Sequence, residues 1–446
     1  MAPSPFSGTL SADEGAYKRL VASINPEWIE AALEATGTAT LRKRRLPAEQ
    51  VIWLVLGMAL YRHQPIDGLA ARLDIALPGV DDKLSVAKSA LAQARARLGD
   101  EPLRWLFEKC STKWALESAR RHAWRGLSVF GVDGTTVRVP DSPQNRAHFG
   151  SQDAGASRGV SGYPLSRVVT LMALRSHLLL DARFGPYAAE SHYAKDLWPR
   201  IPDDSVTLVD RGFLDAKILI PLAESGTSRH WLTRARSTST SRFVKVLGDG
   251  DDLVEFDVSK EARRQDPTLP KTWKVRAIAY QRPGFAPQEL LTSMLDSKRF
   301  PAKEIVALYH ERWELELGYD EVKTDMLERQ EAIRSKTPKG VAQELWAIGL
   351  AYNLVRLEME RVAAEAKLPP TRISFIMALR LIRDEWMWIS GTNSPGAVPG
   401  HLRRLREDIA RFILPERRVR TQPRAVKLKM SNYPRKRPKP LVSSPK

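Results

Sequence analysis

The sequence predicts an α/β protein in which a mixed sheet follows an all-helical N-terminal domain and is interrupted by a β-rich insertion domain. Three changes of pattern support this prediction. Apolar residues recur at three- and four-residue spacing from about residue 12 to 125, which is typical of helices. After residue 127, short apolar runs predict strands that first form an antiparallel set and then alternate with helices. From 236 to about 293, short strands are separated by polar, glycine-rich turns.

Prolines divide the N-terminal region into separate helices. The run 47–61 is apolar on most sides and predicts a buried helix. Shorter helices are expected at 66–73 and 85–98, the second with Ser85 as its N-cap and Gly99 just beyond its end. The polar and basic surface of this second helix could enter a DNA major groove, and an ordinary solvated helix face fits it equally well. That surface is formed by Lys88, Gln93, Arg95 and Arg97.

The α/β region begins with two apolar runs on either side of Asp133-Gly134, a dipeptide that is typical of a two-residue hairpin turn. We expect helices at 190–200 and 214–224. The strands of the sheet are expected at 127–132, 135–139, 165–174, 177–184, 205–209 and 231–235, and those of the insertion at 243–247, 253–258, 273–280 and 289–292.

A late helix opens at Pro301, which we expect in the N1 position, and further helices are expected at 339–366, 372–388 and 401–413. The remaining Pro-, Arg- and Lys-rich segment predicts a disordered tail with affinity for phosphate. The predicted domains are a helical, DNA-binding unit at 1–125, catalytic halves at 126–235 and 301–366, the insertion at 236–300, a helical region at 367–415 and the tail at 416–446.

Composition narrows the classes of function. The formal net charge is +18, and eleven basic residues follow Glu416, where no acidic residue remains. Because the excess is not confined to one amphipathic helix, nucleic acid is a better partner than a membrane surface. The single cysteine, Cys110, excludes a thiolate zinc cage and fits a reducing, cytoplasmic compartment. No secretion signal or membrane span is evident.

Three acidic residues are the candidates for metal-dependent chemistry. Asp133 and Asp210 each stand at the end of an apolar run, and Glu316 lies on the late helix. With about 100° per residue, Tyr309, Arg312, Glu316 and Lys323 share one narrow stripe of that helix. Such a set suits a carboxylate site that holds a pair of Mg²⁺ ions while cations and a phenol grip phosphate oxygens.

Each piece has an ordinary structural interpretation when it is taken alone. Asp133-Gly134 fits a simple type I′ turn, and Asp210 fits a loop aspartate that accepts hydrogen bonds from the next turn. Arg312 and Glu316 fit an exposed ion pair, and Tyr309 fits a core aromatic. The order of the three carboxylates favours the functional interpretation, because it matches the layout in which a ribonuclease-H-like sheet brings three such groups together.

At this point the sequence resembles the insertion-sequence-four family of bacterial DDE transposases. The family pattern Y-(2)-R-(3)-E-(6)-K is complete, and the resemblance covers most of residues 25–360. The neighbouring segments also look like the family: GVDGTTVRVPD at 131–141, NRAHFG at 145–150, SGYPLSRVV at 161–169, LVDRGF at 208–213 and LYHERWELE at 308–316.

The resemblance implies a role for each matched residue. Asp133, Asp210 and Glu316 would bind two Mg²⁺ ions, which Mn²⁺ could replace, and would form the catalytic triad. Tyr309, Arg312 and Lys323 would position DNA, and Arg211 beside the second aspartate would contact it. Asp320 lies on the same stripe as Glu316 and would be a competing ligand without the family pattern.

The activity that the resemblance implies is cut-and-paste transposition, in which the enzyme cleaves the ends of its element and joins the 3′-hydroxyls to target DNA. Its partners would be the terminal inverted repeats and target DNA, with a homodimer on paired ends, at the nucleoid. The helices after Lys339 are candidates for the dimer contact.

Two alternatives remain at this stage: a catalytically silent DNA-binding protein, and a structure-selective nuclease of the same fold. Some members of the family also carry a tryptophan where this chain has Gln288 and Glu289. Either no hairpin intermediate forms here, or another aromatic such as Phe285 substitutes for the tryptophan.

Overall fold

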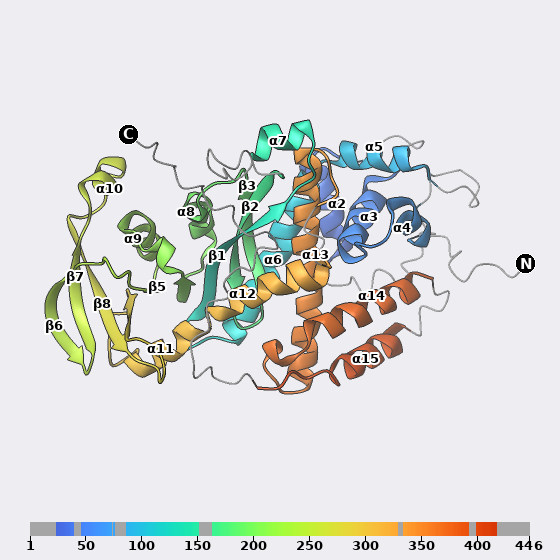
Figure 1. The fold of residues 1–446 in the computed structure, drawn as a ribbon. Helices are drawn as coiled ribbons and strands as arrows, with labels where there is room; N and C mark the ends of the chain where they lie inside the picture. The colour runs from blue at the N-terminus through green and yellow to red at the C-terminus, as the bar shows by residue number, and fades with distance from the viewer. Residues whose placement is uncertain are drawn as a thin grey trace, which may run out of the picture.

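The structure is a computed structural model that describes residues 24–39, 46–73, 75, 86–150, 163–328, 333–391 and 398–416. The predicted helical N-terminal region is confirmed within these residues (Figure 1). Its helices are α2 (Pro26–Ala35), α3 (Ala48–Leu60), α4 (Ile66–Arg72), α5 (Lys88–Leu98) and α6 (Glu101–Arg121). As predicted, α3 is buried, with every residue from Val51 to Leu60 enclosed.

Helix α5 departs in two ways from what the sequence predicts. It begins at Lys88, and the expected cap Ser85 lies outside the described residues, whereas Gly99 follows the helix with φ +71°, as a glycine at this place should. Arg95 does not face a groove, because its side chain is 14% exposed and its Nε donates to Gln343 Oε1 at 3.0 Å. Lys88 pairs with Asp67 at 3.3 Å.

A nine-stranded mixed sheet forms the centre of the chain, in the order β3-β2-β1-β4-β5-β9-β8-β7-β6. The pairs β1–β4 and β4–β5 are parallel, and all other pairs are antiparallel. Its strands are β1 (Ser128–Arg138), β2 (Leu165–Ala173), β3 (Leu178–Gly185), β4 (Ser205–Val209), β5 (Arg229–Arg234), β6 (Arg242–Gly248), β7 (Asp251–Asp257), β8 (Thr272–Tyr280) and β9 (Gln288–Thr292).

The hairpin turn expected at Asp133-Gly134 is wrong. One continuous strand, β1, runs through both residues, and Asp133 pairs with Thr170 and Gly134 with Val169 of β2. A turn signal of two residues is local, whereas the ladder with β2 satisfies the backbone of nine consecutive residues of β1. Tertiary pairing therefore overrides the turn propensity.

The strands expected between residues 236 and 300 are present, and they extend the sheet itself. β9 pairs with β5, and β8, β7 and β6 follow outward from β9 (Figure 1). A short helix, α10 (Lys260–Gln265), lies between β7 and β8. Arg276 on β8 is fully buried and forms a bidentate pair with Asp251, which ties β8 to β7.

The remaining helices lie around the sheet. Helix α6 contacts β3, and the long α13 contacts both α6 and β3. In the described residues no helix has the length and apolar character needed to cross a bilayer. The helices around the sheet not yet given bounds are α7 (Pro143–Phe149), α8 (Glu190–Ala194), the 3₁₀ segment η1 (Lys195–Arg200), α9 (Ala216–Glu224), α13 (Pro338–Glu365), α14 (Phe375–Gly391) and α15 (Val398–Ile409).

The single late helix that the residue stripe requires is divided into three parts. α11 (Ala302–His310) is followed by α12 (Trp313–Asp320), which continues into a π-helical segment, η3 (Glu321–Met326). Pro301 is the N-cap residue of α11 and not its first helical residue. Because a π segment has more residues per turn than an α-helix, the regular 100° spacing holds only as far as α12.

Two glycines let α12 lie close to the sheet. A Cβ on Gly131 of β1 would stand 2.8 Å from Leu315, and a Cβ on Gly318 of α12 would stand 2.5 Å from Met172. The helix therefore sits against β1 and β2 at a distance that larger residues at these two positions would prevent.

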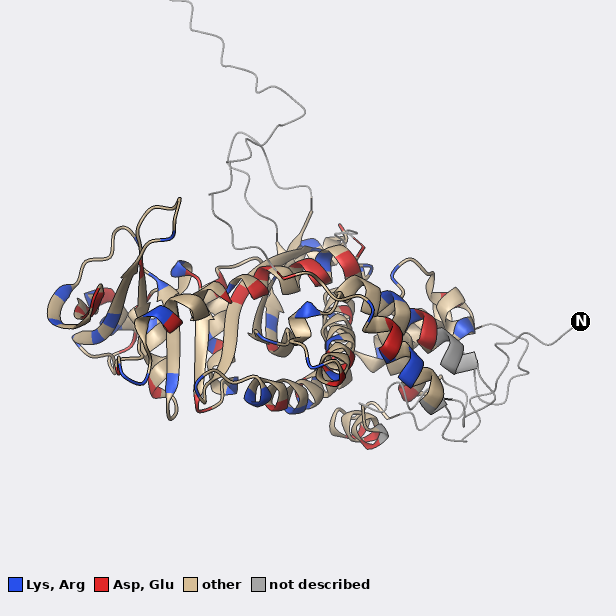
Figure 2. Cartoon of the chain, turned by 90° about the horizontal axis from the view of Figure 1, so that it is seen from below, with Lys and Arg blue, Asp and Glu red and all other residues tan. Residues whose placement is uncertain are grey.

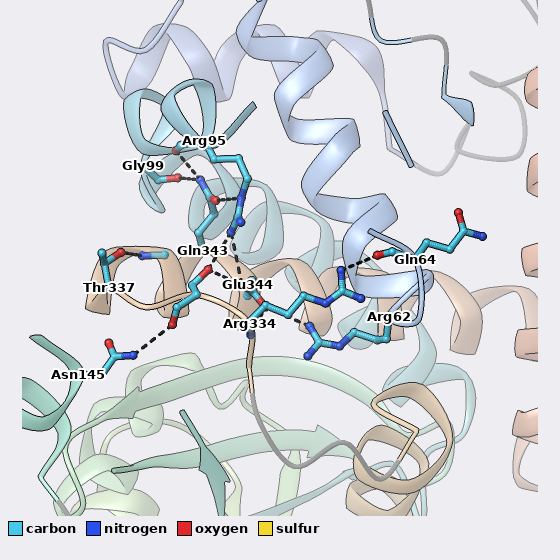
Figure 3. A network of polar contacts seen from close by, with 11 residues as sticks. Arg62, Gln64, Arg95, Gly99, Asn145, Arg334, Thr337, Gln343 and Glu344 are labelled. Atoms are coloured by element: carbon cyan, nitrogen blue, oxygen red, sulfur yellow. Dashed lines mark hydrogen bonds and ion pairs between the residues drawn. The ribbon is translucent and has the colours of Figure 1, made fainter. Parts of the chain in front are cut away.

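Buried polar contacts join the N-terminal helices to the rest of the chain (Figure 3). Glu344 of α13, 3% exposed, pairs with Arg62 at 3.0 Å and with Arg95 at 3.5 Å. It also accepts from the backbone N–H of Arg334 at 3.1 Å, and Arg334 donates to the Gln64 carbonyl at 2.9 Å. One carboxylate thus connects helices α3 and α5 with the segment that precedes α13.

We expect Glu344→Ala to lower the free energy of unfolding by about 3–5 kcal/mol, because Arg62 would lose the carboxylate that balances its buried charge. Glu108→Ala is the matched control. Its pair with Arg104 is also helical but lies at the surface, with Arg104 54% exposed, and should be worth less than about 1 kcal/mol. Urea denaturation measures both losses, and equal losses would contradict the role given to Glu344.

Candidate active site

The strand register brings two of the predicted acidic residues together. Val132 of β1 is paired in parallel with Val209 of β4, and this is the last pair of that ladder. Asp133 and Asp210 are the next residues on the two strands, so both follow the same edge of the ladder. Asp210 also caps a short 3₁₀ turn at Arg211–Phe213. The two aspartates are 77 residues apart in sequence, and Asp133 within β1 is therefore a neighbour of Asp210, which directly follows β4.

The carboxylate of Asp133 is in an unfavourable place for a charge. Burial raises its pKa to about 6, and this effect exceeds the lowering by the Gly134 N–H and by Arg312. The nearby charges of Glu190 and Asp210 add smaller increases. The Gly134 N–H donates to Asp133 Oδ1 at 2.8 Å. A Cβ on Gly134 would collide with the Glu190 side chain, so a glycine at this position lets Glu190 lie close to β1.

Arg312 lies among the acidic residues. Its Nη1 is 3.8 Å from Asp133 Oδ2, and its Nη2 donates to Glu316 Oε1 at 3.2 Å. Burial acts to lower the pKa of Arg312, but the charges of Tyr309, Asp133, Asp210 and Glu316 together raise it. The guanidinium is 18% exposed and Glu316 is 42% exposed. Arg312 thus links the helical glutamate to the strand aspartates, which an isolated surface pair would not do.

Tyr309 and Lys323 have different surroundings. Burial raises the pKa of the Tyr309 phenol, which is close enough to Arg312 and Asp210 to feel their charges. Lys323 lies in η3 and lines a largely apolar cavity of about 70 Å³ together with Val137 of β1. The structure therefore keeps Tyr309, Arg312 and Glu316 together and places Lys323 against this cavity.

Backbone contacts hold the aspartates in place. The Tyr319 hydroxyl donates to the carbonyl of Asp133 at 2.5 Å, and the Thr170 hydroxyl lies 2.8 Å from the same phenol. Arg236 donates to the carbonyls of Arg211, at 2.8 Å, and of Gly212, at 2.9 Å. These contacts fix β1 under α12 and the loop that follows Asp210.

Sequence reasoning missed Glu190, Arg236 and Tyr319. Glu190 opens α8, and Arg236 follows β5, where neither residue has a motif around it. Tyr319 lies in α12 between Gly318 and Asp320. A glycine at position 318 was the available sequence signal that this part of the helix lies close to the sheet. Asp320 itself is exposed at the end of α12.

Within the described ranges, no three His, Cys, Asp or Glu side chains form a group that could hold one metal ion. The chemistry of the donor set nevertheless fits a divalent cation. The pKa of Asp133 stays raised by burial even with Arg312 nearby, and a hard cation would stabilise its charged form. Joint coordination by Asp133, Asp210 and Glu316 stays a prediction.

The fold and this group of residues define the class of the protein, a transposase of the DDE type. Residues 124–354 match the family described as the transposase DDE domain, and residues 15–108 match the N-terminal domain of the insertion element 4 transposase. The chain belongs to the insertion-sequence-four (IS4) family of transposases. Enzymes with a DDE transposase domain generally use divalent metal ions.

Relatives agree with this assignment. The chain is 39% identical to the transposase InsG for insertion sequence element IS4 from Escherichia coli (strain K12), over 92% of each chain. It is 36% identical to the putative transposase InsZ of the same strain, over 49% of this chain and 72% of that protein. A piggyBac transposase synaptic complex with hairpin DNA aligns at 12% identity over 90% of this chain and 84% of that one, with a TM-score of 0.41.

The excess positive charge is not concentrated on one element of the described chain. Figure 2 shows Lys and Arg interspersed with Asp and Glu over the helices and strands. The basic segment expected at 416–446 lies, apart from Glu416, outside the described residues.

We expect Asp133→Asn to stabilise the metal-free protein at pH 8. The folded-state pKa of about 6 lies above the value of 3.8 for an ordinary aspartate, so the native state loses stability as the pH rises through 6. Asparagine removes this loss, and the gain should be about 1–3 kcal/mol at pH 8 and should shrink towards pH 5.

Urea denaturation in EDTA at both pH values measures this gain. Asp320→Asn, at an exposed position on α12, is the control and should show no such change with pH. A gain of equal size at pH 5 and pH 8 would contradict the assigned cause.

Proposed function

We propose that this protein is a cut-and-paste DNA transposase that cleaves the ends of its insertion sequence and joins the 3′-hydroxyls to target DNA. The observation that carries the proposal is the parallel register Val132–Val209, which puts Asp133 and Asp210 on adjacent strands below the helix of Glu316. The strand order β3-β2-β1-β4-β5, with two antiparallel pairs followed by two parallel pairs, supports a ribonuclease-H-like catalytic core.

The residues have distinct proposed roles. Asp133, Asp210 and Glu316 would hold two Mg²⁺ ions, which when bound lower the pKa of the attacking water or 3′-hydroxyl and neutralise the leaving 3′-oxygen. Mn²⁺ could replace them. Arg312 balances the carboxylates in the metal-free chain, and its planar guanidinium is suited to bidentate contact with a phosphate.

Other residues would bind the DNA strand. Tyr309 stands beside Arg312, and the exposed Arg211 directly follows Asp210, so both border the proposed reaction centre. Lys323 would contact the DNA phosphates from η3. We assign DNA binding also to the N-terminal domain 1–125, within which 15–108 match an insertion element transposase domain.

The domain division follows from these roles. Residues 126–235 and 301–366 would form the catalytic core, 236–300 the insertion that widens the sheet, and 367–415 a helical region. Two copies would act together on the paired ends of the element, with the helices after Lys339 as the proposed contact. The substrates would be chromosomal DNA of the nucleoid, which requires action in the cytoplasm.

We expect Asp133→Asn, Asp210→Asn and Glu316→Gln each to lower the rate of DNA cleavage by about 100-fold or more, because each removes a metal-binding charge. The assay combines purified protein, Mg²⁺ and DNA that carries the element's inverted repeats. Asp320→Asn is the matched control on α12 and should retain cleavage.

The assay also separates the alternative functions. DNA binding by the three variants should persist, since their phosphate contacts remain. Binding without metal-dependent cleavage by the wild-type protein would support a silent DNA-binding protein, and cleavage without strand joining would support a nuclease. Full cleavage by any of the three variants would refute its assigned role.

A further inference from the structure

The turn between β2 and β3 makes unusual contacts with the helix that carries Glu316. It consists of residues 174–177, and we call its last three residues, Arg175, Ser176 and His177, the clamp turn. His177 is 1% exposed and adopts φ +61°, a left-handed conformation that is uncommon for a histidine. The buried ring and the strained backbone both indicate that the surrounding structure holds this residue in one position.

Both ring nitrogens of His177 contact glutamates of α12 and of η3, which continues it. Nε2 lies 2.8 Å from Glu314 Oε2, and Nδ1 lies 3.2 Å from Glu321 Oε2. These two glutamates are seven residues apart, and seven residues make about two helical turns, which places them along one side. Glu316 lies two residues beyond Glu314, about 200° around the helix. His177 therefore holds the side opposite to the one that presents Glu316.

The pair Arg175–Glu311 extends the contact between the clamp turn and the helix towards the start of α12. Arg175 forms two hydrogen bonds with Glu311, at 2.8 and 2.7 Å, and its Nη1 donates to the carbonyl of His122 at 3.1 Å. A bidentate Arg–carboxylate pair fixes orientation as well as distance. The clamp turn thus contacts one glutamate of α12, Glu314, and one on each side of this helix, Glu311 and Glu321.

Helix α13 supports the same group from behind. Arg356, 1% exposed, lies 3.3 Å from Glu321 Oε1 and donates from Nε to the Ser176 carbonyl at 2.8 Å. The Tyr352 hydroxyl donates to Glu321 Oε2 at 2.7 Å. Since Glu321 begins the π segment, these contacts hold the point at which the α-helical geometry ends.

We propose that the clamp turn sets the position of Glu316 relative to Asp133 and Asp210, and that His177 is a positioning residue for the reaction. The inference rests on the proposed function, in which these three carboxylates share the metal ions. Rotation of α12 about its axis or sliding along it would move Glu316 away from β1. The two His177 contacts oppose both movements because they lie at separate turns of one face.

On the sheet side, Leu315 and Gly318 pack against β1 and β2 through apolar surface, which has little directionality. The Tyr319 hydroxyl adds one hydrogen bond to the Asp133 carbonyl there, and His177 holds the opposite face. The two contacts of His177 are directional and buried, so a small rotation would leave a carboxylate without its partner.

The test compares His177→Leu with His177→Asn in the full-length protein. Leucine removes both contacts, whereas asparagine tolerates the left-handed backbone and keeps a donor for one glutamate. The first readout is amide hydrogen exchange across residues 311–321 in EDTA. We expect exchange about 10–100 times faster in His177→Leu and an intermediate value in His177→Asn.

The second readout is the Mn²⁺ concentration at which half of the metal-induced rise in melting temperature occurs. It should increase about 10–100-fold in His177→Leu, with partial rescue in His177→Asn, while DNA binding in EDTA stays unchanged. His401→Leu is the matched control, since His401 pairs with Glu385 at 3.0 Å on α15 and α14, and it should leave both readouts unaltered.

Each outcome decides a separate claim. Unchanged exchange across 311–321 in His177→Leu, or a lower melting temperature with an unchanged metal response, would overturn the positioning role. If His177→Leu fails to fold, Glu314→Gln replaces it, because this variant keeps the Glu321–Arg356 pair and should show the same two changes. Absence of any metal response in the wild-type protein would instead refute the proposed function, and hydrogen exchange alone would then decide the clamp.

Discussion

The parallel pairing of β1 with β4 is the constraint on which the rest of the site depends. Because the ladder ends at Val132 and Val209, Asp133 and Asp210 follow on neighbouring strands. Pairing shifted by one residue would turn one aspartate to the other face of the sheet. The same register places a carboxylate where burial raises its pKa to about 6, so the site is formed at a cost in stability that a bound cation would relieve.

Cationic side chains reduce that cost in the metal-free chain. Arg312 contacts both Asp133 and Glu316 from one helix position, and its guanidinium cannot lose its proton at any physiological pH. Around the opposite face of α12, Arg175 pairs with Glu311, Arg356 pairs with Glu321, and the buried His177 ring contacts Glu314. The acidic helix can therefore lie against the sheet because each of these enclosed carboxylates has a hydrogen-bonding partner.

Regular hydrophobic spacing in the sequence predicted most helices and strands, and the features that it missed depend on contacts between distant parts of the chain. Period-two and period-3.6 spacing located the strands and most helices, since each depends on local burial. The hairpin at Asp133-Gly134 failed because the ladder with β2 engages the same backbone groups. The prediction of a basic, groove-facing surface on α5 was wrong for Arg95, because this residue contacts Gln343 and Glu344, about 250 positions away. Glu190 lies close to Asp133 through a similar long-range contact, which local patterns do not predict.

The residue stripe shows where a one-dimensional pattern stops being valid. Tyr309, Arg312 and Glu316 stay together because the backbone between α11 and α12 remains in the right-handed helical region, with Glu311 at ψ −16° and Arg312 at ψ −28°. Five residues after Glu316 the chain enters the π segment, and each residue there turns through a smaller angle than in an α-helix. Lys323 stands in this segment and lines the cavity beside Val137. A change of helix type, which hydrophobic spacing does not encode, thus alters the angle at which the fourth member of the motif leaves the helix.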